Sequence, residues 1–199
     1  MQAKKSIIRI FLILLIIGLT SCTNDISKEE NSEKEIIVMD NYTSYTGYTS
    51  YESALDTAHT VVYGTIKDIG EPYEADYGDE KYVIKHYFTP ITIEVAEYIK
   101  GENNASTVVF EAQGAEYKDV IYDYKAYDTL DFEIGDKILV FLSKRNQSIG
   151  PQCVISEDEN GKATRVALGE NKEADTLREQ VELVKNTYTK MLADRRTTE

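Results

Sequence analysis

The stretch that decides the fold is Gly135-Asp136-Lys137-Ile138-Leu139-Val140-Phe141-Leu142. Its last five residues are the most apolar run of the chain after residue 22. A strand that is apolar on both faces has to be covered on both faces, so this run predicts a central strand of a sheet. Gly135 and Asp136 are common turn residues, and they predict a turn that leads into the strand.

Three further strands are predicted before this run. Residues 60–69 are rich in Val, Ile, Thr and Tyr, and Gly64 in their middle predicts a bend or a close approach of two backbones. Residues 82–98 alternate apolar and polar side chains, which is typical of a sheet with one face in water. Pro90 should lie at an edge or a bulge, because it cannot donate a ladder hydrogen bond. The third strand covers residues 107–112.

A hairpin and two helices complete the expected elements. Asn160-Gly161 predicts a turn that joins residues 150–156 to residues 162–168. Ser50 is the expected N-cap of a short helix that ends near Thr57. An amphipathic helix is predicted over residues 172–193, and its buried stripe has spacings of four and three: Leu177, Val181, Val184, Tyr188 and Met191.

The first 21 residues have the anatomy of an export signal. Lys4, Lys5 and Arg9 are followed by the apolar run 10–18 and then by small residues. This run is too short to span a bilayer, which takes about 20 apolar residues.

Leu19-Thr20-Ser21-Cys22 resembles the bacterial lipobox, in which an aliphatic residue and two small residues precede an obligate cysteine. The resemblance implies cleavage between Ser21 and Cys22 and attachment of diacylglycerol to the Cys22 sulfur. Two acyl chains anchor a protein stably to a membrane, where one chain does not. We therefore expect a lipid-anchored protein on the extracytoplasmic face of a bacterial membrane. An uncleaved signal anchor and an ordinary secretory signal are the alternatives.

The chain is strongly acidic. It has 22 Lys and Arg against 35 Asp and Glu, a net charge of −13, and removal of the leader with its three basic residues lowers this to −16. Nucleic-acid partners and electrostatic adhesion to anionic lipid need clusters of Lys and Arg that the sequence lacks. With Cys22 acylated, Cys153 has no intramolecular partner, so we expect it to be a small buried hydrophobe of a core that does not rely on disulfides.

These features divide the chain into a signal peptide (1–21), a flexible stalk (22–49), a β-domain (50–170) and a C-terminal helix packed on it (171–194). The stalk is polar and has too little apolar surface to offset the entropy of ordering. From the second half of this segment onward, tyrosines recur at every third position. We favour a tether whose rings pack on the domain over a row of stacking platforms for a sugar or partner. The tyrosines are Tyr42, Tyr45, Tyr48 and Tyr51.

Three stretches of the β-domain together resemble a known fold: residues 58–66, residues 97–101, and residues 135–142. They are similar to small exported bacterial β-barrel domains of the netrin-like and metalloproteinase-inhibitor type of OB-fold. The resemblance implies a mainly β fold, a small OB-like antiparallel β-barrel with a short N-terminal helix and a C-terminal amphipathic helix. In the animal inhibitors an N-terminal cysteine amine reaches the protease metal. Here Cys22 is expected to be acylated and remote from the barrel, so inhibitory activity is not implied.

Little in the sequence points to catalysis. The two histidines, His59 and His86, lie 27 positions apart, and the zinc-protease, nucleophile-elbow and phosphate-loop motifs are missing. We therefore expect no enzyme, no metal and no cofactor. An envelope hydrolase would need one of these histidines beside a carboxylate and a nucleophile.

Two acidic segments lack the spacing of calcium-binding loops, so we interpret them as solvated turns, with weak calcium binding as the alternative. The first contains Glu71, Glu74, Asp76, Asp79 and Glu80, and the second contains Glu157, Asp158 and Glu159.

Residues 115–131 alternate tyrosines with acids, and an insertion here would lie beside the face where OB-type barrels bind partners. Tyrosine beside carboxylate suits a sugar or a basic protein surface. The alternative, which we favour, is an edge strand whose charges deter aggregation. The candidate partner-binding residues are Tyr117, Tyr122, Tyr124 and Tyr127.

The sequence therefore predicts a non-enzymatic surface lipoprotein that binds a protein or a cell-wall component. An envelope hydrolase is the first alternative. An immunity lipoprotein that shields its own cell from a cationic toxin is the second.

Overall fold

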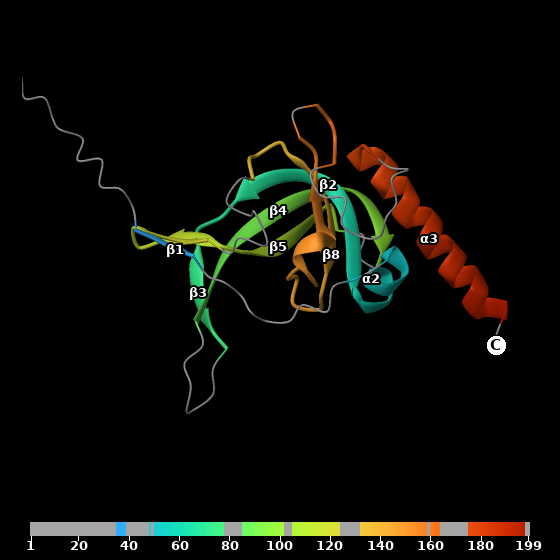
Figure 1. Cartoon of the computed structure of the whole chain (residues 1–199), viewed down its shortest axis with the longest axis horizontal. Coiled ribbons are helices and arrows are strands. Elements are labelled where there is room, and N and C mark those ends of the chain that lie inside the picture. The colour runs from blue at the N-terminus through green and yellow to red at the C-terminus, as the bar shows by residue number, and fades with distance from the viewer. Residues whose placement is uncertain are drawn as a thin grey trace, which may run out of the picture. The chain divides into compact units, whose positions relative to one another are not determined.

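The computed structural model describes residues 35–38, 48, 50–77, 85–101, 105–123, 132–158, 160–163 and 175–197. The chain divides into two units, Met1–Glu33 and Lys34–Glu199, and every described residue belongs to the second. The described fold is mainly β with antiparallel pairing in its main sheet, as predicted, and it has two α-helices (Figure 1). Neither of these helices is long and apolar enough to cross a bilayer.

The main sheet has six strands in the order β3-β4-β2-β8-β9, with β5 paired to β4. The strands are β2 (Thr60–Ile69), β3 (Tyr73–Asp76), β4 (Lys85–Lys100), β5 (Thr107–Gln113), β8 (Lys137–Leu142) and β9 (Val154–Ser156). A smaller sheet has the order β1-β7-β6, and its strands are β1 (Glu35–Val38), β6 (Ala115–Tyr117) and β7 (Val120–Asp123). The helices are α2 (Tyr51–Thr57), α3 (Leu177–Thr197) and the 3-10 turn η2 (Pro151–Cys153).

Strand β1 lies within the segment that we expected to be a flexible stalk. Residues 35–38 pair in parallel with β7, Glu35 with Val120 and Val38 with Asp123. Its sequence, Glu-Ile-Ile-Val, is the only apolar run of that segment, and its β-branched residues suit a strand. The stalk was predicted from the polar composition of the whole segment, so this short apolar run was not recognised as a strand.

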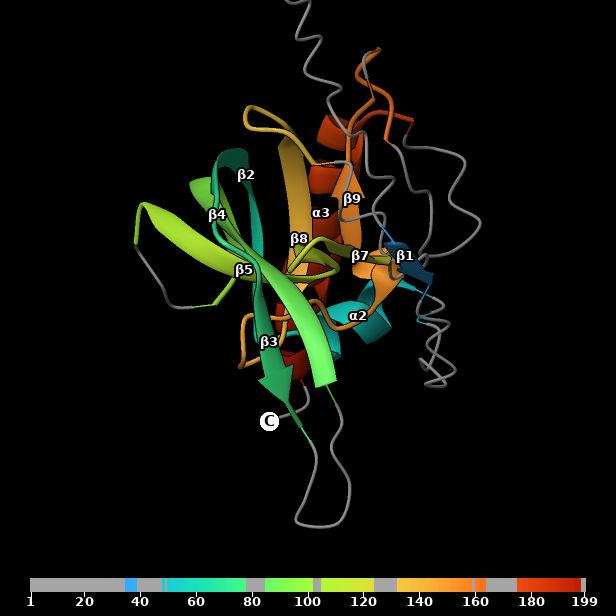
Figure 2. The same cartoon turned by 90° about the vertical axis from the view of Figure 1, so that its left-hand side faces the viewer.

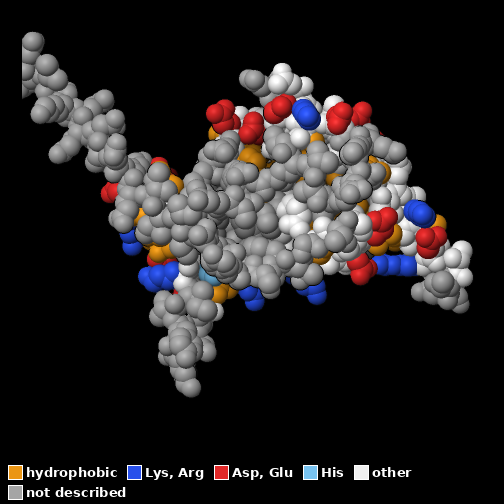
Figure 3. Space-filling model, in the orientation of Figure 1, with side chains coloured by type: hydrophobic (Ala, Val, Ile, Leu, Met, Phe, Trp, Pro, Cys, Tyr) orange, Lys and Arg blue, Asp and Glu red, His pale blue; other side chains and the backbone are white. Residues whose placement is uncertain are grey.

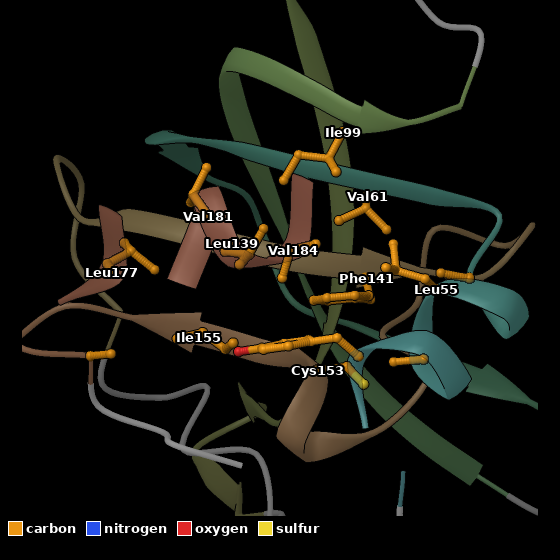
Figure 4. Packing of buried hydrophobic residues seen from close by; sticks show 14 residues of the cluster. Leu55, Val61, Ile99, Leu139, Phe141, Cys153, Ile155, Leu177, Val181 and Val184 are labelled. Atoms are coloured by element: carbon orange, nitrogen blue, oxygen red, sulfur yellow. The ribbon is translucent and has the colours of Figure 1, made fainter. Parts of the chain in front are cut away.

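The prediction that residues 138–142 form a central strand is confirmed. Strand β8 pairs with β2 on one side and β9 on the other. Its five apolar residues are fully buried and alternate between two cores. Leu139 and Phe141 pack in a cluster with α2 and α3 (Figure 4). Ile138, Val140 and Leu142 pack with β4 and β5 on the other side.

The cluster under the helices also contains Cys153, which is fully buried as predicted, and the last two tyrosines of the repeat. The Tyr51 ring stacks on Phe141 at 6.1 Å, and its hydroxyl donates to Oε1 of Gln180 on α3. Tyr48 is half-buried against the same cluster. These two tyrosines therefore contact the core, while Tyr42 and Tyr45 lie outside the described residues.

Of two backbone expectations about the long strands, the one for Gly64 is confirmed, whereas Pro90 pairs with Glu111 of β5 and lies at a break in the ladder on its other side rather than at a sheet edge or a bulge. A Cβ on Gly64 would lie 2.3 Å from the Glu94 carbonyl oxygen, so β2 and β4 approach here as only glycine allows. Pro90 sits where the partner of β4 changes from β2 to β3. The Gly70 N–H donates to the Pro90 carbonyl at 2.8 Å, and the missing Pro90 donor falls in this break of the ladder.

The described pairings do not close the main sheet into a barrel, so the predicted barrel is not confirmed. Two isolated bridges lie between the open strands. Glu111 of β5 pairs in parallel with Gln147, and Leu142 of β8 pairs with Ser148. Residues 147–148 thus contact strands on both sides of the gap.

The helices match the predicted faces but not every boundary. Ser50 caps α2 as expected, with its Oγ accepting from the Ser53 N–H at 3.3 Å. Helix α3 begins at Leu177, five residues later than predicted, because Thr176 and Glu179 form a reciprocal capping box. The predicted stripe of α3 faces the core. The Asn160-Gly161 turn is present, with Glu157 bridged to Ala163, and residues 164–168 lie outside the described residues.

Candidate functional site

The first candidate site lies beside the β6–β7 hairpin, which faces the viewer in Figure 2. Lys118 and Asp119 join the two strands with φ angles of 51° and 64°. Two successive left-handed residues are the signature of a tight type I′ hairpin. The two strands of the hairpin are only three and four residues long, so the alternation of tyrosines and acids does not extend far enough to identify either strand from the sequence.

Tyr117 and Tyr122 fix this hairpin onto β4. The ring of Tyr122 stacks on Tyr87 with centroids 3.5 Å apart, and the ring of Tyr117 tilts against Tyr87 at 5.6 Å. The Tyr87 hydroxyl donates to Glu74 Oε2 at 2.9 Å. Hydrogen bonds from Lys85 and Tyr87 hold the pKa of Glu74 below its usual value. Tyr124 and Tyr127 lie outside the described residues.

The opposite face of the hairpin lines a cleft of about 520 Å³. Glu116 and Ile121 are a cross-strand pair, and side chains alternate along a strand, so this pair faces away from Tyr117 and Tyr122. The sequence therefore indicated this segment without predicting its hairpin, and the cleft is lined by the face opposite Tyr117 and Tyr122. The remaining lining residues come from the end of β2 and its link to β3, from β4 and from the segment before β8: Ile69, Gly70, Glu71, Pro72, Thr89, Ile91 and Phe132.

The second candidate site is a hollow of about 670 Å³, which the sequence analysis missed. We call it the basic hollow. It forms where the start of β2, the end of β4, the turn after β8 and helix α3 meet. Its lining residues, all in the described part of the chain, include two lysines and a histidine but no Asp or Glu: His59, Thr60, Lys100, Gly101, Lys144, Asn146 and Tyr188.

The backbone holds the rim of the basic hollow in place. The His59 N–H donates to the Leu142 carbonyl at 2.8 Å, which joins the residue before β2 to the end of β8. Gly101 has a φ of +108°, and a Cβ there would lie 3.2 Å from the Thr60 hydroxyl oxygen. The turn at Lys100-Gly101 therefore requires glycine to bring β4 to the start of β2.

Lys100 is the least exposed cation of the basic hollow. Its Nζ donates to the Leu55 carbonyl oxygen in the last turn of α2. Burial lowers the pKa of Lys100, and the nearby charge of Asp56 opposes that shift. The Asp56 carboxylate is itself ion-paired with Arg195 of α3 at 2.6 Å.

The two histidines do not share a site. His86 is the second residue of β4, whereas His59 lies next to the end of β4, because Val61 pairs with Lys100. The His86 ring packs edge-on against Tyr77 at 5.3 Å, and burial lowers its pKa. The described residues contain no group of three His, Cys, Asp or Glu side chains able to hold a metal ion.

The acidic segments expected to be solvated turns have internal partners where they are described. Glu74 and Asp76 belong to strand β3, and Glu74 is ion-paired with Lys85 at 2.9 Å. Asp158 Oδ1 accepts from the Asn160 and Lys162 N–H groups at 2.9 Å, and these bonds lower its pKa. Glu157 is ion-paired with Lys137 at 2.6 Å. Asp79, Glu80 and Glu159 lie outside the described residues.

Ser21 and Cys22, the predicted cleavage and lipid-attachment residues, also lie outside the described residues. No protein-family model matches this chain, and no curated protein matches it.

Proposed function

We propose that this protein is anchored by lipid to the extracytoplasmic face of a bacterial membrane, and that its β-domain binds a protein or cell-wall partner without catalysing a reaction. The leader followed by Leu19-Thr20-Ser21-Cys22 supports the anchor. The charge of the chain after cleavage is repelled by anionic lipid, so acyl chains at Cys22 would supply the attachment.

We also infer that the main sheet is an OB-like barrel that remains partly open. The OB-fold is itself a partly open five-stranded barrel. Two pairings in the main sheet support this inference: β2 pairs with both β4 and β8, and β5 pairs with β4. The bridges of Gln147 to β5 and of Ser148 to β8 lie where a closing strand would run.

The observation on which the binding role depends is the cleft beside the β6–β7 hairpin. Its volume of about 520 Å³ is in the range of ligand sites in proteins. Its walls come from four separate parts of the chain, and the Tyr87–Tyr122 stack holds the hairpin against β4. A cleft with a fixed wall can bind a partner with little loss of its own conformational entropy.

The lining of the cleft indicates the chemistry of the partner. Its floor is apolar, with Ile91, Ile121 and Phe132 among the contributors. Glu71 and Glu116 are exposed carboxylates of the same lining. An apolar side chain flanked by basic groups fits this combination, so a basic peptide segment of a protein or of the cell wall is the partner that we propose.

Site-specific photo-crosslinking in living bacteria tests this proposal. A crosslinking amino acid replaces Glu116 in the full chain, and a control chain carries it in place of Glu52, an exposed residue of α2. We expect a discrete adduct from position 116 that is lost when Ile121→Lys is added, because the new cation repels a basic partner. Adducts that are absent at position 116, or equal at both positions, would refute the binding role of the cleft.

A further inference from the structure

The basic hollow concentrates positive charge on a protein whose net charge is −13. Lys100 and Lys144 are 44 positions apart in the sequence, and the fold brings both into one lining. In Figure 3, acidic side chains gather along the upper margin and several basic ones lie along the lower margin, while both kinds lie near the end of α3. The net charge of the chain therefore does not describe the local charge of this part of the surface.

The lysine ammonium groups of the hollow are available for a ligand. Lys100 is partly buried, and its Nζ donates to a neutral carbonyl oxygen rather than to a carboxylate. A cation that has lost part of its hydration is stabilised by an anion that replaces the lost water. Lys144 is exposed on the turn after β8. Asp56, the acid whose charge acts on Lys100, is occupied by its ion pair with Arg195.

We propose that the basic hollow binds a phosphate group carried by a sugar-sized or polyol-sized molecule. Phosphate offers more acceptor oxygens than a carboxylate, and the lining offers matching donors in the ammonium groups of Lys100 and Lys144 and the amide of Asn146. The volume of about 670 Å³ exceeds what a bare phosphate fills, and Tyr188 supplies a ring for the body of the ligand.

This site is separate from the hairpin cleft, and the two sets of lining residues have no member in common. The same phosphate chemistry occurs on soluble metabolites as a monoester and on lipid headgroups as a diester. Glucose 6-phosphate and glycerophosphoglycerol represent these two sources, and glucuronate represents a carboxylate on a sugar.

Calorimetric titration of the full chain in a non-ionic detergent tests the proposal with these three compounds. The site variant is Lys100→Gln with Lys144→Gln. The control is Lys67→Gln with Lys162→Gln, which removes the same charge from two exposed lysines outside the hollow. Lys144→Gln alone lies on an exposed turn and serves as the site variant if the double substitution prevents folding.

We expect saturable binding of a phosphate compound, weakened about tenfold or more in the site variant and unchanged in the control. Added salt should weaken it as well. Tighter binding of glycerophosphoglycerol assigns the site to lipid headgroups, and tighter binding of glucose 6-phosphate assigns it to soluble phosphates. Absence of saturable binding, equal loss in both double variants, or equal affinity for glucuronate would overturn the proposal.

Discussion

Gly64 shows at the residue scale how little space separates β2 from β4. A Cβ at this position would lie 2.3 Å from the Glu94 carbonyl oxygen and 2.6 Å from Ile93 Cγ2. Gly64→Ala should therefore lower the free energy of unfolding by about 2 to 3 kcal/mol, because backbone atoms have to move.

The matched control for this prediction is Gly161→Ala. Gly161 has a φ of +75° with nothing within 4 Å of the added Cβ, so only the backbone conformation is strained, at a cost of about 1 kcal/mol. Urea denaturation of both full chains compares the two costs. Equal losses of stability would show that β2 and β4 are not in close contact at Gly64.

Cys153 gives a second prediction at this scale. Burial raises the pKa of its thiol to about 12, and its side chain is fully enclosed. The folded protein isolated from membranes should therefore show no reaction with Ellman's reagent at pH 8, since the thiolate is the reactive form.

Denaturation in guanidinium adds a count of thiols to this test. The sequence contains 2 cysteines, and acylation of the Cys22 sulfur would leave Cys153 alone to react. We expect one reactive thiol per unfolded chain. Two reactive thiols would contradict the acylation of Cys22, and rapid reaction of the folded chain would contradict the burial of Cys153.

Single residues with a unique backbone role could be predicted from the sequence. Gly64 was, because no other residue type allows two backbones to approach so closely. Pro90 was placed only in outline, because its missing N–H restricts it to positions where the ladder needs no donor. The members of the basic hollow could not be. Lys100 and Lys144 each have the features of an ordinary surface lysine, and only the pairing of β2 with both β4 and β8 brings them together.

At the scale of elements, the start of α3 depends on its capping box. The Glu179 carboxylate accepts from the Asp175 and Thr176 N–H groups at 2.9 Å, and these bonds hold its pKa below its usual value of 4.5. The ionised form thus stabilises the folded state above that usual pKa, and this contribution is lost as the pH falls through the depressed pKa.

Glu179→Ala should accordingly reduce stability at pH 7 and have a smaller effect as the pH is lowered through that range. Thermal unfolding at several pH values measures the difference from the unsubstituted chain. Lys190→Ala, an exposed change on the same helix, is the control. A destabilisation by Glu179→Ala that stays constant from pH 7 to the acid limit would rule out the charged cap.

The turn of the β6–β7 hairpin is strained by its own residues. Lys118 and Asp119 adopt φ angles of 51° and 64°, which lysine disfavours and which Asn-Gly adopts easily. Replacing the pair by Asn-Gly should stabilise the hairpin by about 1 kcal/mol. Slower amide hydrogen exchange of Ile121 and Tyr122 would confirm this, and unchanged or faster exchange would argue against a type I′ turn.

Helices and strands were predicted well where their apolar pattern extends over many residues, and less well where the element is short. Strand β2 and the stripe of α3 have clear patterns and were located correctly. Strands β1, β6 and β7 have three or four residues each, too few for a period of two to stand out from a polar background. The start of α3 was misplaced because the Thr-x-x-Glu signal at Thr176 was overlooked.

At the scale of the whole molecule, the fold of the β-domain and the proposed location depend on different parts of the sequence. The β-domain follows from its central strand and two cores, which the sequence pattern predicted in outline. The proposed location rests on the leader and on Cys22. A folded acidic domain and the proposed acylation of Cys22 together support the surface binding protein proposed above.

Mass spectrometry of the N-terminal peptide, from the full chain expressed in bacteria and recovered from membranes, tests the proposed lipid anchor most directly. The account predicts a peptide that begins at Cys22 and has the added mass of a diacylglyceryl group on the cysteine sulfur. A chain that still begins at Met1, or an unmodified peptide that starts at another residue, would contradict it.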